Sequence, residues 1–155
     1  MGATVVSGDL GDRRPDDLEL VVFEVGGQRH GVISTAVCEV LPAVTLTPVS
    51  GGSRLVEGVV NVRGSILPVV DVRVWLGLET RPMEPTDHMI VVRVGERSAM
   101  LRVDRAVELI RLARSEIEAA NGLQSAAGGI SGFAKLPDGP MPVHELESLL
   151  AEAVG

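Results

Sequence analysis

The chain has 155 residues, of which 45% are hydrophobic and 23% are charged, a composition typical of a single soluble globular domain. Its net charge of −7 and its aromatic content of 2% argue against nucleic acid as a partner, since neither phosphate attraction nor base stacking is available. The single cysteine cannot form an internal disulfide, and charged residues interrupt every long apolar run, so we expect a cytoplasmic protein without direct membrane insertion.

The N-terminal residues differ in composition from the rest of the chain. Residues 1–17 are small, polar and charged, which predicts a disordered tail. From Leu18 the sequence LELVVFEV alternates apolar residues up to the turn at Gly26–Gly27, and QRHGVI comes next. Two such runs around a glycine turn predict a β-hairpin. VCEVLPAVTLTPV then continues the strands.

The segment GVVNVRGSILPVVDVR, residues 58–73, is the most informative part of the chain. Arg63 lies between two apolar half-strands, where a charge is costly unless it is paired or reaches water. Gly64 allows a turn directly after it. Pro68 lacks the N–H that a central strand needs, which favours an edge strand or a bulge. We therefore interpret this segment as an exposed edge with a fixed arginine, a surface suited to docking a partner.

The remaining elements are predicted to be short. Asp71 is a suitable N-cap for a helix over VRVWLG that ends at Gly77. A proline-rich loop over 78–86 is next, and strands HMIVVRV and SAMLRV come after it. The chain closes with the helix HELESLLAEA, whose leucine stripe we expect to pack on the chain's own core. Many short strands with frequent turn signals predict a mainly β fold of small barrels.

The two halves of the chain resemble each other. Residues 21–41 align without a gap on residues 90–110, and residues 68–76 resemble residues 142–150 in the same order. Repetition at such a long period predicts two similar subdomains rather than a solenoid. We place them at about 18–77 and 87–150 within one domain over 18–150.

The sequence carries no familiar enzyme signature. It lacks a P-loop, a GxGxxG motif after a strand, a CxxC pair and an HExxH motif. Cys38 lies inside a predicted strand and is interpreted as a buried structural thiol. His30, His88 and His144 show no spacing typical of a metal site. We therefore expect no catalytic residue, cofactor or metal. A small enzyme that pairs Cys38 with a histidine is the alternative from another class.

Glu39 and Arg63 are two charges embedded in strand-like apolar sequence. If their strands adjoin, the carboxylate can hold the guanidinium in a fixed, bidentate geometry. The alternative is two independent charges that both face solvent.

These segments resemble a known family, the CheW-like adaptors of bacterial chemosensory arrays. GVVNVRGSILPVVDVR resembles the family's central signature nearly throughout, LVVFEVGGQRHGV resembles its opening hairpin, and PVHELESLL its closing helix. The resemblance covers about residues 18–150. The chain departs from the family pattern at His30–Gly31, Met100 and His144–Glu145.

The resemblance implies two SH3-like five-stranded barrels and no catalysis. It also implies two partners, the cytoplasmic tip of chemoreceptors and the regulatory domain of a CheA-type histidine kinase, which would recruit the protein to membrane-associated receptor arrays. An adaptor of a non-flagellar chemosensory pathway is the alternative within the family. The positions that match the family's receptor-binding surface are Val37, Glu39, Gly58, Asn61, Arg63, His88 and Leu109.

Overall fold

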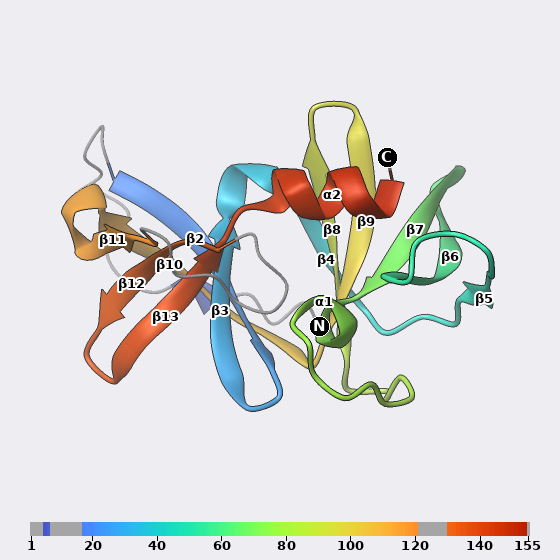
Figure 1. Cartoon of the computed structure of the whole chain (residues 1–155), viewed down its shortest axis with the longest axis horizontal. Coiled ribbons are helices and arrows are strands. Elements are labelled where there is room, and N and C mark those ends of the chain that lie inside the picture. The colour runs from blue at the N-terminus through green and yellow to red at the C-terminus, as the bar shows by residue number, and fades with distance from the viewer. Residues whose placement is uncertain (1–4, 7–16, 121–129, 155) are drawn as a thin grey trace.

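The computed structural model of the protein describes residues 5–6, 17–120 and 130–154. Strands dominate these residues and form two sheets that lie side by side, with the helix α2 crossing between them (Figure 1). The predicted mainly β fold with short helices is therefore confirmed.

The first sheet contains seven strands in the spatial order β1-β10-β2-β3-β13-β12-β11. Hairpin β2–β3 is the predicted first hairpin, and both glycines of its turn have positive φ, 61° at Gly26 and 80° at Gly27. Glycine adopts this conformation without a steric penalty. The strands of this sheet are β1 (Val5–Val6), β2 (Asp17–Val25), β3 (Gln28–Ile33), β10 (Arg105–Ala113), β11 (Ile117–Ala119), β12 (Ile130–Leu136) and β13 (Gly139–His144).

The second sheet contains six strands in the order β4-β8-β9-β7-β6-β5. Two short 3₁₀ helices, η2 (Ser34–Ala36) and η3 (Arg114–Glu116), precede β4 and β11. The strands of this sheet are β4 (Val37–Pro42), β5 (Thr47–Pro48), β6 (Val56–Val62), β7 (Ser65–Asp71), β8 (His88–Val94) and β9 (Arg97–Val103).

The two sheets repeat one strand order once β1 is set aside. The order β10-β2-β3-β13-β12-β11 corresponds to β4-β8-β9-β7-β6-β5, with a parallel pair at β3–β13 and at β9–β7. The repeated topology agrees with the sequence duplication.

The sheets are not formed by consecutive halves of the chain, however. Hairpin β2–β3 belongs with β10–β13, and hairpin β8–β9 belongs with β4–β7. The expected division at 18–77 and 87–150 therefore does not separate the two sheets, because the first hairpin of each half belongs to the sheet that the other half mainly forms. Parallel neighbours need a long connection, and β3 finds its parallel partner β13 more than a hundred residues away.

Two short α-helices are present in the described residues. In α1 (Val72–Trp75) the Asp71 carboxylate accepts a hydrogen bond of 3.0 Å from the Arg73 N–H, and Gly77 follows with a φ of 75°. The predicted cap and the predicted stop are both confirmed. The closing helix α2 spans Leu146–Val154. Neither helix is long and apolar enough to cross a membrane.

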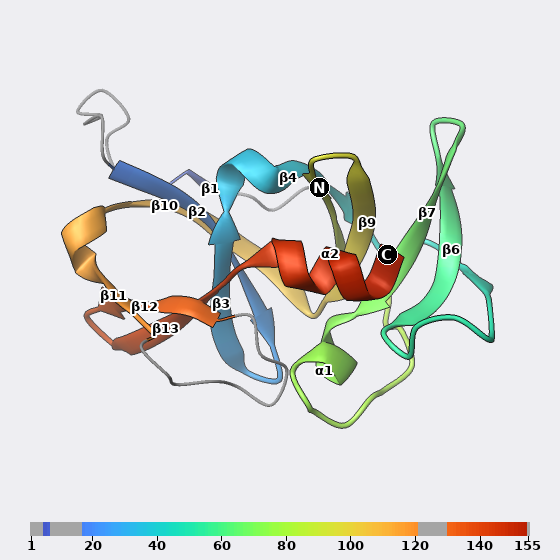
Figure 2. The ribbon, with the colours of Figure 1, turned by 45° about the horizontal axis from the view of Figure 1, so that its top comes forward.

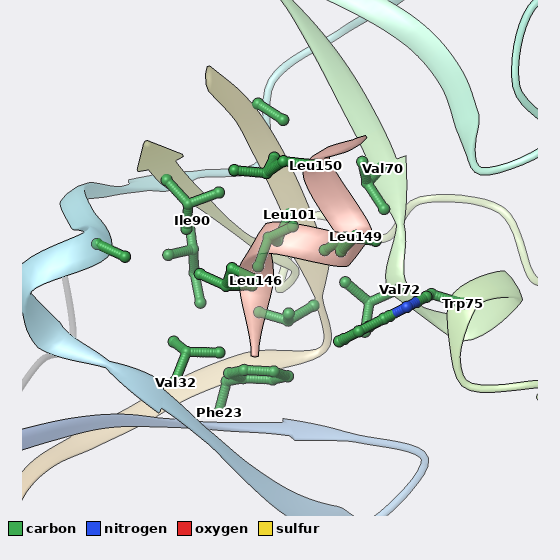
Figure 3. Packing of buried hydrophobic residues seen from close by; sticks show 14 of the residues in the cluster. Phe23, Val32, Val70, Val72, Trp75, Ile90, Leu101, Leu146, Leu149 and Leu150 are labelled. Carbon is green, nitrogen blue, oxygen red and sulfur yellow. The ribbon is translucent and has the colours of Figure 1, made fainter. Parts of the chain in front are cut away.

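The largest core cluster lies between the two sheets. Leu146, Leu149 and Leu150 of α2 are buried and pack there against strands of both sheets, as Figure 3 shows. Phe23 and Trp75 complete one side of this cluster. Full burial of a leucine side chain stabilises a fold by about 1.5–3 kcal/mol. The predicted role of α2, packing on its own domain, is confirmed.

Each sheet also buries residues of its own. One cluster, around Leu20 and Met141, comes only from the seven-stranded sheet. Another cluster, around Met89 and Met100, comes from the six-stranded sheet and the loops beside it. A sheet that buries one face against itself is curled, which is what a small barrel requires.

The prediction of a disordered tail over 1–17 needs a correction. Val5 and Val6 form β1, which pairs in parallel with Glu108 and Leu109 of β10, and Asp17 is the first residue of β2. The other positions of that tail lie outside the described residues. Two adjacent valines have high strand propensity, a local signal that the polar composition of the segment concealed.

Candidate functional site

Arg63 lies at the tip of hairpin β6–β7, which projects from the body of the molecule (Figure 2). Arg63 has a φ of 51° and Gly64 a φ of 89°, the positive pair typical of a two-residue hairpin turn. The Asn61 side-chain oxygen accepts a hydrogen bond of 2.8 Å from the Gly64 N–H and fixes this turn. Arg63 is the only non-glycine residue with positive φ among the described residues. Its side chain is 72% exposed.

Glu39 holds this arginine in place. The guanidinium donates two hydrogen bonds to the Glu39 carboxylate, one from Nη1 to Oε1 and one of 3.0 Å from Nη2 to Oε2. These hydrogen bonds keep the pKa of Glu39 below its ordinary value and raise the pKa of Arg63. The predicted bidentate pair is therefore present.

The pair connects two strands that are not neighbours in the sheet. Glu39 lies on β4, one edge of the six-stranded sheet, whereas the tip of β6–β7 belongs near the other edge. The ion pair thus links β4 to the β6–β7 tip, which do not pair as strands. It also holds an exposed guanidinium in a fixed orientation. A planar donor fork of this kind suits recognition of carboxylate or carbonyl groups.

The expected edge position of residues 58–73 is correct only in part. The edge strand is β5, which has two residues, and β7 pairs with both β6 and β9. The pairing with β9 begins only at Val69, so Pro68 lies just before it, where a missing N–H costs least. The first half of β7 therefore has a partner on one side only.

Val37 and Leu109 come from different sheets but pack, half-buried, against the same central core cluster. Val37 opens β4 beside a bulge, two residues from Glu39. Leu109 lies on β10, where Val21 and Val6 are its strand partners. The structure therefore brings Glu39 and the β6–β7 tip together with Val37 two residues from Glu39, whereas Leu109 lies on the other sheet.

Gly58 and His88 have structural roles. A Cβ at Gly58 would lie 2.4 Å from Cδ1 of Leu46 and 2.6 Å from the carbonyl oxygen of Thr47, so only glycine lets β5 approach β6. The His88 Nδ1 accepts a hydrogen bond of 2.8 Å from the Ala106 N–H, and burial lowers the pKa of its imidazole. Both residues shape the backbone around the site.

Cys38 is exposed, so the prediction of a buried thiol is wrong. Because β4 is an edge strand with a bulge between Val37 and Glu39, its middle side chain faces outward. No histidine hydrogen-bonds to Cys38 in the described part of the chain.

Two histidines meet in the interior, a contact that the sequence did not reveal. The Nδ1 of His30 and the Nε2 of His144 share a hydrogen bond of 2.8 Å, and each residue is less than 5% exposed. The two histidine rings lie in a row of ring contacts from Phe23 to Trp75, with centroid distances of 5.6, 5.0 and 4.8 Å; only Phe23 and His30 are stacked, and the other two pairs are tilted. Burial lowers the pKa of His30 to about 4 and that of His144 to about 3. His30 and His144, which belong to two of the three departures from the family pattern, are thus in direct contact.

A second missed feature is a buried charge network. Arg102 of β9 is 3% exposed at its side chain and contacts the carboxylates of Glu57, Asp71 and Asp87. Arg81 of the proline-rich loop also binds Asp87, at 2.7 Å. The network fixes that loop against the six-stranded sheet.

Beside this network lies an open groove of about 480 Å³. Most of its lining residues are apolar, and two are glutamates. It is lined by Ala43, Val44, Thr45, Leu46, Glu57, Met83, Glu84 and Pro85.

Residues 19–154 match the family described as the CheW-like domain. The chain is 24% identical over 134 residues to the chemotaxis protein CheW of Helicobacter pylori, covering 86% of this chain and 81% of that protein. It is 35% identical over 102 residues to the chemotaxis protein CheW of Rhizobium meliloti, covering 64% of each. The crystal structure of the scaffolding protein TtCheW from Thermoanaerobacter tengcongensis is similar with a TM-score of 0.78 and 28% identity, over 85% of this chain and 91% of that one.

Proposed function

This chain belongs to the CheW-like domain family, and we propose that it is a non-enzymatic scaffold that couples chemoreceptor tips to a CheA-type histidine kinase. The observation that carries the proposal is the Glu39–Arg63 pair, an oriented and exposed guanidinium at the tip of a projecting hairpin. Relatives named as chemotaxis proteins and as a scaffolding protein support the same role. We expect the protein to act in the cytoplasm and to reach membrane-associated arrays through its partners.

The receptor surface that we propose centres on Val37, Glu39, Asn61 and Arg63, with Leu109 on the adjoining sheet. Arg63 supplies an oriented donor fork, and Val37 supplies apolar area beside it. Gly58 and His88 support this surface through the backbone contacts that they allow. An arginine next to half-buried apolar residues is a common arrangement at binding hot spots.

We propose the groove over residues 43–46 and 83–85 as the kinase contact. Its mostly apolar lining suits a protruding apolar side chain of the kinase. These groove residues lie on the connections from β4 to β5 and from α1 to β8, whereas Arg63 lies at the tip of β6–β7. Two partners could then bind at once.

Binding of the intact protein to a receptor cytoplasmic tip and to a kinase regulatory domain tests the proposal. We expect both to bind. Thr45→Glu adds charge and bulk at an exposed groove position, so it should reduce kinase binding at least tenfold while receptor binding stays unchanged. Absence of binding to both partners would refute the scaffold role, and equal loss of both would refute separate surfaces.

An adaptor of a non-flagellar chemosensory pathway would use the same surfaces with different receptors. Identification of the proteins that co-purify from native cells decides between the two pathways. The enzyme alternative is tested by Cys38→Ser, which should leave signalling intact because the exposed thiol has no histidine partner among the described residues.

A further inference from the structure

The seven-stranded sheet has a strand without a counterpart in the six-stranded sheet. β1 lies along the outer edge of β10 in parallel, with Val5 opposite Glu108 and Val6 opposite Leu109. The corresponding edge, that of β4, carries no added strand among the described residues. An edge strand offers unpaired N–H and C=O groups to any extended segment.

The position of β1 coincides with part of the proposed receptor surface. Its strand partner Leu109 is one of the residues assigned to that surface. Leu109 is half-buried and, like Val37, packs against the central core cluster. A partner that reaches Leu109 along this edge meets the N-terminal segment first.

We propose that β1 is an intramolecular competitor of the receptor tip for the edge of β10 at Leu109. The inference rests on the proposed function. Ten residues, 7–16, separate β1 from β2 in the sequence, and a tether of that length gives an effective concentration of order 1 mM. A strand of two residues pairs weakly, so closed and open forms coexist, and the partner's apparent affinity falls by the open fraction.

Val6→Pro in the full-length protein tests the competition. Proline fixes φ and removes the N–H, so it should disrupt a two-residue strand. We expect receptor-tip affinity to rise about two- to tenfold. Amide hydrogen exchange in residues 105–113 of the free protein should also become faster. Val6→Ile is the matched control, because it keeps the N–H and strand propensity, and it should behave like the unmodified protein.

The outcomes separate this inference from the proposed function. Faster exchange together with tighter receptor binding supports competition. Unchanged exchange shows that β1 does not cover β10, and faster exchange with unchanged or weaker affinity shows that it does not compete; either overturns the inference. If the unmodified protein binds no receptor tip, the proposed function itself fails, and the competition fails with it.

Discussion

The buried pair His30–His144 should make the protein acid-sensitive well above the pH at which carboxylates titrate. Both imidazoles are neutral in the fold, because burial lowers their pKa values to about 4 and about 3 from an ordinary 6.5. The unfolded chain binds protons near pH 6.5, whereas the folded chain does not. Stability is therefore complete above pH 6.5 and is lost as the pH falls from 6.5 toward the folded pKa values.

The size of this loss in unfolding free energy depends only on the pKa of the histidines in the unfolded chain, as long as the pH stays above both pKa values in the folded protein. When the pH falls from 7.5 to 5.5, each buried histidine lowers the unfolding free energy by about 1.4 kcal/mol, so the pair lowers it by about 3 kcal/mol. The chain has three histidines, and the third, His88, also has a lowered pKa but is less buried. A loss of this size is a substantial part of the stability of a typical domain.

Urea unfolding at pH 7.5 and 5.5, followed by the fluorescence of the single tryptophan Trp75, measures this loss. His30→Gln keeps a hydrogen-bonding group beside His144 but does not titrate, so the loss should shrink by about 1.4 kcal/mol. His88→Asn is the control and should change the loss by less. If unfolding free energy is the same at both pH values, or if His30→Gln retains the full loss, the reasoning is wrong.

Two further predictions concern packing and buried charge, and urea unfolding measures both. Gly58→Ala should destabilise by about 1–3 kcal/mol, because its Cβ would lie 2.6 Å from the Thr47 carbonyl oxygen, whereas Gly52→Ala, with no atom within 4 Å, should stay within about 0.5 kcal/mol. Arg102→Met should cost about 3–5 kcal/mol, because the buried Asp71 loses its ion pair and the buried Asp87 keeps only Arg81. Lys135→Met removes an exposed pair and should cost less than about 0.5 kcal/mol. Equal effects of a variant and its control would contradict either prediction.

The sequence predicted local elements well because their signals are local. The Gly26–Gly27 turn, the Asp71 cap and the leucine stripe of α2 each depend on neighbouring residues, and all three are present. The exchange of hairpins between sheets is not local. Alternating strands from either half satisfy the same pattern, so the sequence alone did not reveal which half supplies the partner of β3.

The candidate site also has features that the sequence predicts and features that depend on long-range contacts. The Glu39–Arg63 pair was predictable because two charges in apolar strands need a partner. The contact between His30 and His144 joins residues that are 114 positions apart, and no spacing rule connects them. The one available signal was that both replace apolar or aromatic residues of the family pattern. The predicted burial of Cys38 is wrong because its exposure depends on the edge position and the bulge of β4, and these tertiary features are not visible in the sequence.

The receptor-tip affinity of Arg63→Ala, measured together with its unfolding midpoint, tests the central claim most directly. We predict at least about thirtyfold weaker binding, the loss typical of a hot-spot residue, at an unchanged midpoint. Arg63→Lys should restore little, because an ammonium lacks the planar fork, and Glu39→Ala should show a milder loss. Arg93→Ala is the control, since Arg93 is an exposed arginine beside another hairpin turn of the same sheet, and it should bind normally. Normal binding by Arg63→Ala would contradict the docking role, and unfolding of that variant would show that Arg63 is a structural charge instead.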